Sequence, residues 1–527
     1  MSPRTDPARQ IASMRRMYVR PSVDAQPVGT RGMTILRLAL AVSAVAAALA
    51  QTANGYQSAN PAVLAQRASA ALKARDFETA ERLYRQLAEQ FPNEPGLALN
   101  LGLALYSSGK CRDAIGPLER FLEAQPNHAP ALLLVGVCHQ NLEQPTDARR
   151  ALERAVALDP DNSRARLELA DALLKDHQPE QAAQQFRRLA RGDPENPKAW
   201  LGLALSYTEL SRRAAETLEQ TAPNSEYHHL LLAHSAQAQG RYRAAFAHYR
   251  EAEGVNAKAP GIHAAVAEVY ERVGQVEWAQ AERAKRGTAR PCDQRPLECW
   301  FESGEFDRIV DASAGSGDPG PLYWRARAFG EIARQANERI LALPPSAVGF
   351  RLLASIEDLA GNPREATKAW KQAVQMAPKD PLLRRSLLRS LQSAGLHDAA
   401  LREAEALLDL RPDSAAARYY KGDALVQLGR ADEAVGLLEE AVGLSNGDRN
   451  IRAALATAYL MVGRGLEAIP HLEAVVAHRE DERLLFQLSR AYQSAGRTAD
   501  ATVALEKRAA LVRARPRPSG SDEITSP

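Results

Sequence analysis

Residues 92–126 read PNEPGLALNLGLALYSSGKCRDAIGPLERFLEAQP, and this stretch contains the pattern that decides the fold. The proline recurs at a constant interval, because Pro92, Pro126, Pro160 and Pro194 follow one another 34 residues apart. Each proline stands beside Asp, Asn or Gln, a composition that ends one helix and begins the next. The pattern therefore predicts a chain built from a repeated unit.

Each cycle of the repeat is expected to form two helices. Apolar residues of the first half recur at the spacing of three and four residues that is typical of an amphipathic helix. A Gly or short polar turn follows, and the second half centres on a small residue that would let two helices cross closely. This residue is Ala80, Ala114, Ala148 or Ala182 in successive cycles. Neither helix can bury its apolar stripe alone, so stability is expected to come from stacking on neighbours.

This pattern resembles the tetratricopeptide repeat (TPR), whose signature is a large residue, Leu-Gly/Ala, Tyr, Ala, an aromatic residue, Ala and Pro. The resemblance covers roughly residues 61–508 apart from one break. It implies an all-α fold, an α-α solenoid superhelix of about 12–14 TPR-type helix pairs. The C-terminal cycles keep turn glycines at Gly361, Gly395, Gly429, Gly463 and Gly496, and central alanines at Ala366, Ala400, Ala434, Ala468 and Ala501.

The sequence is predicted to divide into five parts. These are an N-terminal extension with a signal peptide (1–50), an N-terminal TPR array (51–284), an irregular junction (285–321), a C-terminal TPR array (322–510) and a disordered tail (511–527).

The period of the repeat weakens at three places. Residues 298–311 and 322–343 are each predicted to form a degenerate helix pair. In the cycle from residue 197, the second helix is predicted to be short, over 212–220, because it runs into Pro223-Asn224.

The N-terminus has the features of an export signal. A basic stretch precedes the apolar run from Leu38 to Leu49, which ends in Ala48-Leu49-Ala50. This predicts an exported protein, periplasmic or extracellular, with Met33 as an alternative start. The apolar segment 35–50 is short for a transmembrane helix, but its retention as a membrane anchor is the alternative interpretation.

Four cysteines can form two disulfides in an exported protein. Cys111 precedes one second helix and Cys138 lies on the first helix of the next cycle, so a 111–138 bond is predicted. Cys292 and Cys299 lie in the irregular junction, and a 292–299 bond is predicted there. The alternative is free thiols at both places.

Nothing in the composition or motifs predicts catalysis. The 67 basic and 64 acidic residues nearly balance, which gives no case for nucleic-acid binding. The repeats fill the mature chain and leave no room for a catalytic domain, so no enzyme activity, cofactor or small-molecule substrate is expected. The stretch Gly315–Gly320 matches the dinucleotide-binding pattern G-x-G-x-x-G, but without a preceding strand it is predicted to be a loop.

No metal site is predicted from the histidines. His228, His229 and His234 lie close together in sequence, and Cys138-His139 is a possible pair of ligands. No further Asp, Glu or His at helical spacing completes either set, so ordinary surface histidines are the expectation.

The family geometry implies where a partner would bind. In TPR arrays the first helices line a concave groove, and the second, fifth, ninth and twelfth positions of each cycle face it. Arg and Tyr at such positions suggest an extended acidic or carboxylate-bearing partner, although solvated charges are the alternative. In the C-terminal array these residues are Arg351, Arg385, Arg389, Tyr419, Asp423 and Arg490. In the N-terminal array they are Leu99, Leu103 and Tyr106, which would suit a hydrophobic helix or strand.

These expectations together describe a non-enzymatic scaffold of the cell envelope that binds segments of other proteins. Two alternatives remain open. One is an adaptor tethered to the membrane by its N-terminal apolar segment. The other is a regulatory TPR subunit of a separate envelope enzyme or export machine.

Overall fold

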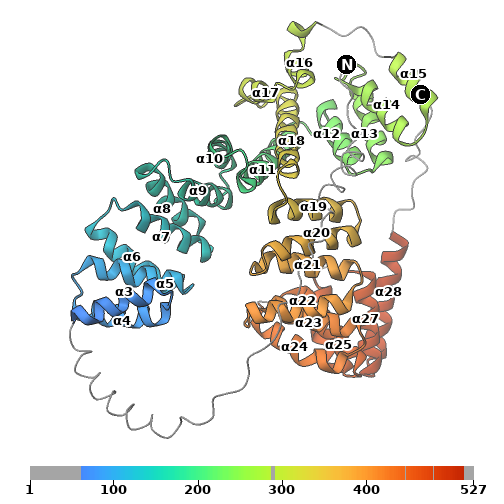
Figure 1. Ribbon diagram of the computed structural model, residues 1–527. Helices are drawn as coiled ribbons and strands as arrows, with labels where there is room; N and C mark the ends of the chain where they lie inside the picture. The colour runs from blue at the N-terminus through green and yellow to red at the C-terminus, as the bar shows by residue number, and fades with distance from the viewer. Residues whose placement is uncertain (1–60, 286–290, 446, 479, 515–527) are drawn as a thin grey trace, which may run out of the picture. The chain divides into compact units, whose positions relative to one another are not determined.

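The structure, a computed structural model, describes residues 61–285, 291–445, 447–478 and 480–514. Within these residues the chain forms 26 α-helices, one short 3-10 helix and no strand. Within the regular repeats the helices form packed pairs, and successive pairs contact one another along the chain (Figure 1). The prediction of an all-α solenoid of helix pairs is confirmed.

The first half of the described chain contains helix pairs of nearly constant length. Most first helices have 13 residues and most second helices 14, as the 34-residue period requires. The helices are α3 (Pro61–Lys73), α4 (Phe77–Gln90), α5 (Pro95–Ser107), α6 (Cys111–Ala124), α7 (Ala129–Asn141), α8 (Pro145–Leu158), α9 (Ser163–Lys175), α10 (Pro179–Gly192), α11 (Pro197–Thr221), α12 (Glu226–Ala238), α13 (Tyr242–Val255), α14 (Ile262–Arg272) and α15 (Val276–Ala284).

The second half begins with shorter or longer elements and then returns to the regular repeat. These elements are η1 (Cys292–Gln294), α16 (Pro296–Ser303), α17 (Phe306–Ala312) and α18 (Pro319–Ala342). The regular helices are α19 (Ala347–Leu359), α20 (Pro363–Met376), α21 (Pro381–Ser393), α22 (His397–Leu410), α23 (Ala415–Gln427), α24 (Ala431–Leu444), α25 (Arg449–Met461), α26 (Gly465–Val476), α27 (Glu482–Ser494) and α28 (Thr498–Ala514).

The turn inside each regular pair depends on one residue with a left-handed backbone. Glycine adopts this conformation without the steric cost of a Cβ atom, and the five predicted C-terminal turn glycines all have φ between 68° and 79°. In the N-terminal pairs three other residues take this role, Arg75, Glu143 and His177, with φ of 61°, 57° and 57°.

Small residues let the two helices of a pair cross closely, as predicted. Ala80, Ala114, Ala148 and Ala182 are all fully buried. Glycines of the first helices make a second close approach. A Cβ atom at Gly422 of α23 would lie 2.6 Å from Cγ of Leu438 on α24, and Gly102 and Gly136 have the same relation to a leucine of α6 and α8.

Two predicted breaks in the helices do not occur. The cycle from 197 forms one continuous helix, α11, and residues 322–343 lie mostly in a second, α18. Among the described residues, neither α11 nor α18 contains a residue with positive φ, the feature that reverses the chain in the regular pairs. The degenerate pair predicted over 298–311 corresponds to α16 and α17.

The chain divides into two compact units, and the division falls within the two long helices. Of the described residues, one unit contains those up to Arg212 together with Phe329–Ala336, and the other contains those of Arg213–Ala328 and those from Asn337 onward. Each unit has its own apolar core. The predicted boundaries at 285 and 321 stay a prediction.

The predicted ends of the chain lie largely outside the described residues. The signal peptide over 1–50 lies outside them altogether. Residues 511–514 of the predicted disordered tail instead belong to α28, and Leu511 packs on the core of its unit; the rest of the predicted tail lies outside the described residues. None of the described helices combines the length and the hydrophobicity that crossing a membrane requires.

Candidate functional site

The first helices of the C-terminal pairs form one continuous layer. Each of α21, α23, α25 and α27 packs on its own second helix and also contacts a neighbouring first helix. Among the described helices, successive second helices make no comparable contact. The first helices therefore form the inner side of a curved stack, where a groove is expected.

A groove of about 1060 Å³ lies on this inner layer. Its walls are residues of three successive first helices and the turns before them. Two predicted residues, Tyr419 and Asp423, line it together with Thr457 and Gln487, which sequence reasoning missed. The Gln487 amide donates a hydrogen bond of 2.9 Å to Thr457 Oγ1, joining α27 to α25 across the groove floor.

Tyr419 and Asp423 form a polar group at one end of the groove. Gln392 of α21 donates a hydrogen bond to the Asp423 carboxylate, so this contact joins two first helices. Burial and the neighbouring Asp423 charge raise the pKa of Tyr419 to about 12, so its hydroxyl remains protonated. A protonated phenol beside a carboxylate offers a partner both a donor and an acceptor.

The predicted arginines are exposed, and within the described residues their guanidinium groups are unpaired. The side chains of Arg351, Arg385, Arg389 and Arg490 make no ion pair or hydrogen bond with any residue that the structure describes. Their neighbour Arg384 behaves differently, because it pairs with Glu403 of α22.

None of the four predicted arginines lines the groove, but Arg385 and Arg389 lie near its Tyr419 end. Burial raises the pKa of Tyr420 on α23, and the nearby charges of Arg389 and Arg385 act against that rise. These arginines thus lie near the aromatic pair Tyr419–Tyr420, whose ring centroids are 5.1 Å apart.

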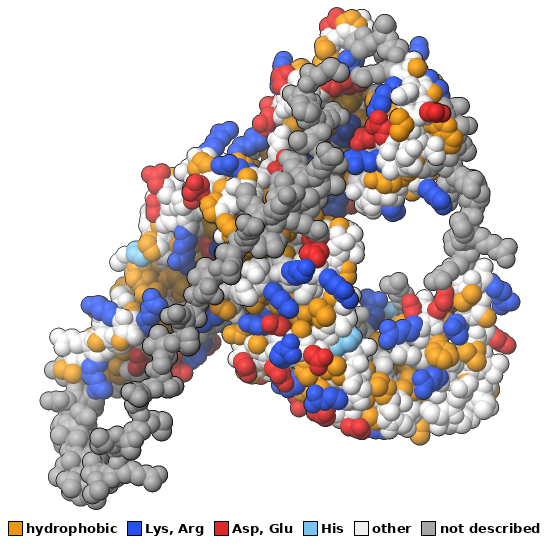
Figure 2. Space-filling model, turned by 45° about the vertical axis from the view of Figure 1, so that its right-hand side comes forward, with side chains coloured by type: hydrophobic (Ala, Val, Ile, Leu, Met, Phe, Trp, Pro, Cys, Tyr) orange, Lys and Arg blue, Asp and Glu red, His pale blue; other side chains and the backbone are white. Residues whose placement is uncertain are grey.

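Elsewhere on the surface, charges of both signs alternate. Figure 2 shows Lys and Arg side chains interspersed with Asp and Glu over the face in view, without one dominant sign. Many charged side chains of the described residues form ion pairs near the start of a helix, such as Arg430–Glu433 and Arg464–Glu467. Such exposed pairs contribute little to stability, but they neutralise the arginines they contain.

The N-terminal candidates are partly used inside the protein. Leu99 and Tyr106 of α5 pack against the core of the first unit, and Leu103 is half-buried. The hydroxyl of Tyr106 accepts a hydrogen bond of 3.2 Å from Arg164 of α9. This contact spans two repeats along the first helices.

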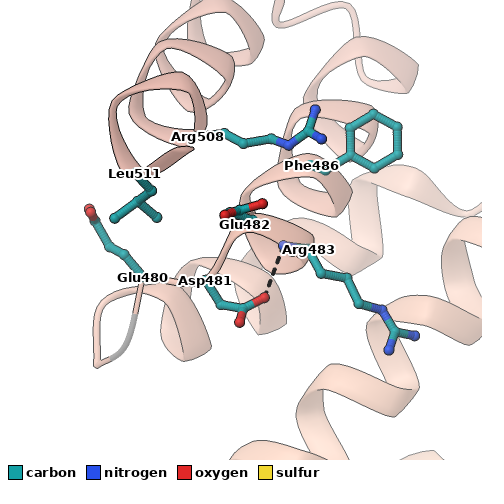
Figure 3. A pocket seen from close by; sticks show the side chains of 7 residues that line it. All are labelled: Glu480, Asp481, Glu482, Arg483, Phe486, Arg508 and Leu511. Carbon is teal, nitrogen blue, oxygen red and sulfur yellow. Dashed lines mark hydrogen bonds between the residues drawn. The ribbon is translucent and has the colours of Figure 1, made fainter. Parts of the chain in front are cut away.

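A second hollow of about 630 Å³ lies between α27 and α28, at the end of the C-terminal array (Figure 3). The guanidinium of Arg508 lies over the ring of Phe486, with 5.1 Å between Cζ and the ring centroid. Asp481 accepts a hydrogen bond of 2.9 Å from the backbone N–H of Arg483 and so caps α27. Glu480 of this hollow forms an ion pair with Lys507, with 3.4 Å between Nζ and Oε1.

The four cysteines behave in two ways. Cys292 and Cys299 form a disulfide that joins η1 to α16, with Cα atoms 5.7 Å apart. The predicted 111–138 bond is absent, and both residues are buried free thiols. Burial raises the pKa of the Cys138 thiol, which also hydrogen-bonds with Cys111, and Asn141 donates to the Cys111 sulfur. Both sulfur atoms therefore have polar partners within the core.

His228 and His229 lie close together, with ring centroids 5.9 Å apart, whereas His234 and His139 have other partners. His234 is buried between Tyr249, whose hydroxyl is 2.9 Å from Nδ1, and Tyr323, whose hydroxyl is 3.1 Å from Nε2. Burial lowers the pKa of His234 well below its ordinary value, and Arg327 adds to this effect. His139 contacts Gln144. The Gly315–Gly320 stretch forms the turn into α18 with no strand before it among the described residues.

The architecture and the site define a class of protein: a stack of helix pairs that presents an inner groove to a partner. Two sequence profiles, both described as the tetratricopeptide repeat, match the chain. One matches residues 141–205 and 425–483, and the other matches 65–129, 99–163 and 385–449. The chain is a tetratricopeptide-repeat protein, and proteins built from this repeat are protein–protein interaction scaffolds.

Several solved structures are similar to parts of the chain. MamA 41-end from Desulfovibrio magneticus RS-1 is 22% identical, with 32% of this chain and 97% of that chain covered and a TM-score of 0.30. A thermophilic TPR protein of Thermus thermophilus is 19% identical, with 32% of this chain and 93% of that chain covered and a TM-score of 0.28. A tetratricopeptide repeat protein from Parabacteroides merdae ATCC 43184 is 13% identical, with 64% of this chain and 99% of that chain covered and a TM-score of 0.31. No curated protein matches the sequence.

Proposed function

We propose that this protein is an exported, non-enzymatic scaffold of the cell envelope, which binds a carboxylate-bearing segment of another protein along the inner layer of its C-terminal array. The observation that carries the proposal is that Arg385 and Arg389 have no partner among the described residues. Their positive charges stand exposed beside the aromatic pair Tyr419–Tyr420, whereas the neighbouring Arg384 is held by Glu403. Guanidinium groups without an internal partner are available for bidentate contact with a carboxylate.

The groove next to these arginines suits an extended or helical segment. It crosses three first helices, and its lining offers the carboxylate of Asp423, the amide of Gln487 and the hydroxyl of Tyr419. A segment with acidic side chains at one end could contact the two arginines, and its backbone could then bond to the amide and hydroxyl groups. Such charge-assisted contacts weaken as salt rises, because the arginines are exposed.

The groove proposal is tested by affinity capture from an envelope extract, followed by mass spectrometry. Three forms of the full chain are compared: the native form, Arg385→Glu/Arg389→Glu, and a matched control, Arg364→Glu/Arg402→Glu. The control reverses the same number of charges at exposed positions on the second helices α20 and α22. A protein retained by the native form and the control but lost by the groove variant supports the proposal. Equal retention by all three forms would show that the chosen surface is wrong.

The location in the envelope rests on the N-terminal sequence, with its basic stretch and the apolar run Leu38–Leu49. Cell fractionation with N-terminal sequencing of the exported form tests it, with Leu40→Arg as the control that interrupts the run. A shortened chain in the soluble envelope fraction supports export with cleavage. A full-length chain that resists a mild wash would instead support the membrane-tethered adaptor. A cytoplasmic chain would refute both.

A further inference from the structure

Two histidines and a glutamate meet between helices α12 and α13. His229 lies in the first turn of α12, and His248 and Glu251 lie three residues apart on α13, which places them on one face of that helix. Oε2 of Glu251 is 2.9 Å from Nδ1 of His229 and 3.1 Å from Nδ1 of His248. The three ligand-type atoms all lie within 4.8 Å of one another. The two imidazole rings are stacked, with centroids 6.2 Å apart.

One nitrogen of this cluster has no hydrogen bond. Nδ1 of His229 is shielded from solvent and makes no hydrogen bond with any described residue, because its short contact with Glu251 is not aligned as one. A shielded polar atom without a partner is uncommon in folded proteins and calls for an explanation. A ring nitrogen beside a second imidazole and a carboxylate is a donor set that a metal ion would satisfy.

We propose that His229, His248 and Glu251 bind one divalent ion of the zinc class. Zinc takes nitrogen ligands at about 2.0–2.1 Å and carboxylate oxygens at about 2.0–2.2 Å, so a tetrahedral centre holds its ligand atoms about 3.3 Å apart. The nitrogen–oxygen distances of 2.9 and 3.1 Å are within a few tenths of that value. Water completes the coordination, since a tetrahedral ion has a fourth position that these three side chains leave open.

The burial of the three side chains suits an ion that enters from solvent and holds two helices together. His229 is 17% exposed, His248 34% and Glu251 54%, so the cluster is sealed on the α12 side and open on the α13 side. Because the ligands come from both helices of one pair, a bound ion links α12 to α13. The ion would stabilise this repeat in proportion to its occupancy.

A neighbouring cluster shows why these three residues are the better candidates. Glu253, His263 and Glu282 also lie close together, but Nζ of Lys285 is 3.0 Å from Oε2 of Glu282. His263 Nδ1 is 2.8 Å from the other oxygen of the same buried carboxylate. The lysine ammonium already neutralises this carboxylate, so a dication is not expected there. His263 therefore serves as a matched control.

The test uses the full chain, purified without a polyhistidine tag, treated with a chelator and titrated with Zn²⁺ in a calorimeter. Co²⁺ is added separately, because the intensity of its visible absorption reports tetrahedral coordination. The ligand variants are His248→Ala and Glu251→Gln, and the controls are His263→Ala and His228→Ala. Circular dichroism verifies that all forms are equally helical.

The wild-type chain and both controls are expected to bind one Zn²⁺, with a rise in the melting temperature. Each ligand variant is expected to lose at least about tenfold in affinity, since loss of outer-shell partners alone commonly costs that much. Glu251→Gln keeps the test decisive if His248→Ala folds poorly, because this side chain is more than half exposed. The proposal is overturned if the wild-type chain takes up no Zn²⁺, or if Glu251→Gln binds it as tightly as the wild type.

Discussion

Substitution of Gly422 by alanine tests whether close contact between helices, rather than helix propensity, governs these repeats. A Cβ atom at Gly422 would lie 2.6 Å from Cγ and 2.8 Å from Cδ2 of Leu438, far inside the usual carbon–carbon distance of about 3.5–4.0 Å. Leu438 is fully buried and cannot move into solvent. The added methyl group must therefore push α23 away from α24.

The expected change in the free energy of unfolding of Gly422→Ala is the sum of two opposing contributions. Alanine gains about 1 kcal/mol over glycine within a helix. Overpacking of a well-packed core costs about 1–3 kcal/mol. In the control Gly436→Ala, on α24 of the same pair, no atom lies within 4 Å of the new Cβ. This variant therefore has the gain in helix propensity without the cost of overpacking. We expect Gly422→Ala to be less stable than Gly436→Ala by about 1–3 kcal/mol, because the propensity gain cancels in the comparison.

The assay is native-state hydrogen exchange measured by mass spectrometry on peptides from α23 and α24, which reports the stability of this pair separately from the rest of the array. Gly422→Ala should exchange faster in both helices than Gly436→Ala. Adding Leu438→Ala should cost less in the Gly422→Ala background than in the wild type, since the methyl group then occupies space that the leucine leaves. Equal protection in the two glycine variants would refute the reasoning.

Other buried or strained groups allow three further tests. His234 stays neutral in the folded protein but takes up a proton in the unfolded chain below pH about 6.5. The free energy of unfolding should therefore fall by about 1.4 kcal/mol per pH unit below that value. Denaturant titrations at several pH values should show that His234→Gln weakens this dependence on pH. Glu143→Gly should stabilise the first unit by about 1 kcal/mol in urea unfolding, because a left-handed backbone costs a non-glycine residue about that much. A loss of stability would instead show an unrecognised role for the Glu143 side chain. Alkylation of the non-reduced protein should modify Cys111 and Cys138 only after denaturation, and a missing mass increase for these two would show that they are paired.

Much of the fold was predictable from the sequence because its signals are local. The proline interval, the buried alanines and the turn glycines each act within one 34-residue cycle, and the structure confirms their effects on helix ends, crossings and turns. The two errors, at α11 and α18, occur where the period weakens. There the absence of a left-handed residue between the two halves of the cycle favours one continuous helix. The number of residues in each cycle did not reveal this continuity.

The candidate sites were less predictable, because they depend on which side of a helix each residue occupies. Arg384 and Arg385 are adjacent in sequence, yet the first pairs with Glu403 and the second is exposed and unpaired among the described residues. The three-residue spacing of His248 and Glu251 was available as a signal, but its partner His229 comes from the preceding helix. Thr457 and Gln487 belong to the groove only because α25 and α27 pack side by side.

The sequence by itself determined that this chain is an all-α stack of tetratricopeptide-type helix pairs, since helix periodicity, helix ends and turns are encoded by residues a few positions apart. Only the tertiary structure decided which charges are neutralised, which cysteines are bonded and which histidines meet. Those outcomes depend on the rotation and crossing of neighbouring helices, where a shift of one residue turns a side chain by about 100° and moves it from a core to a surface.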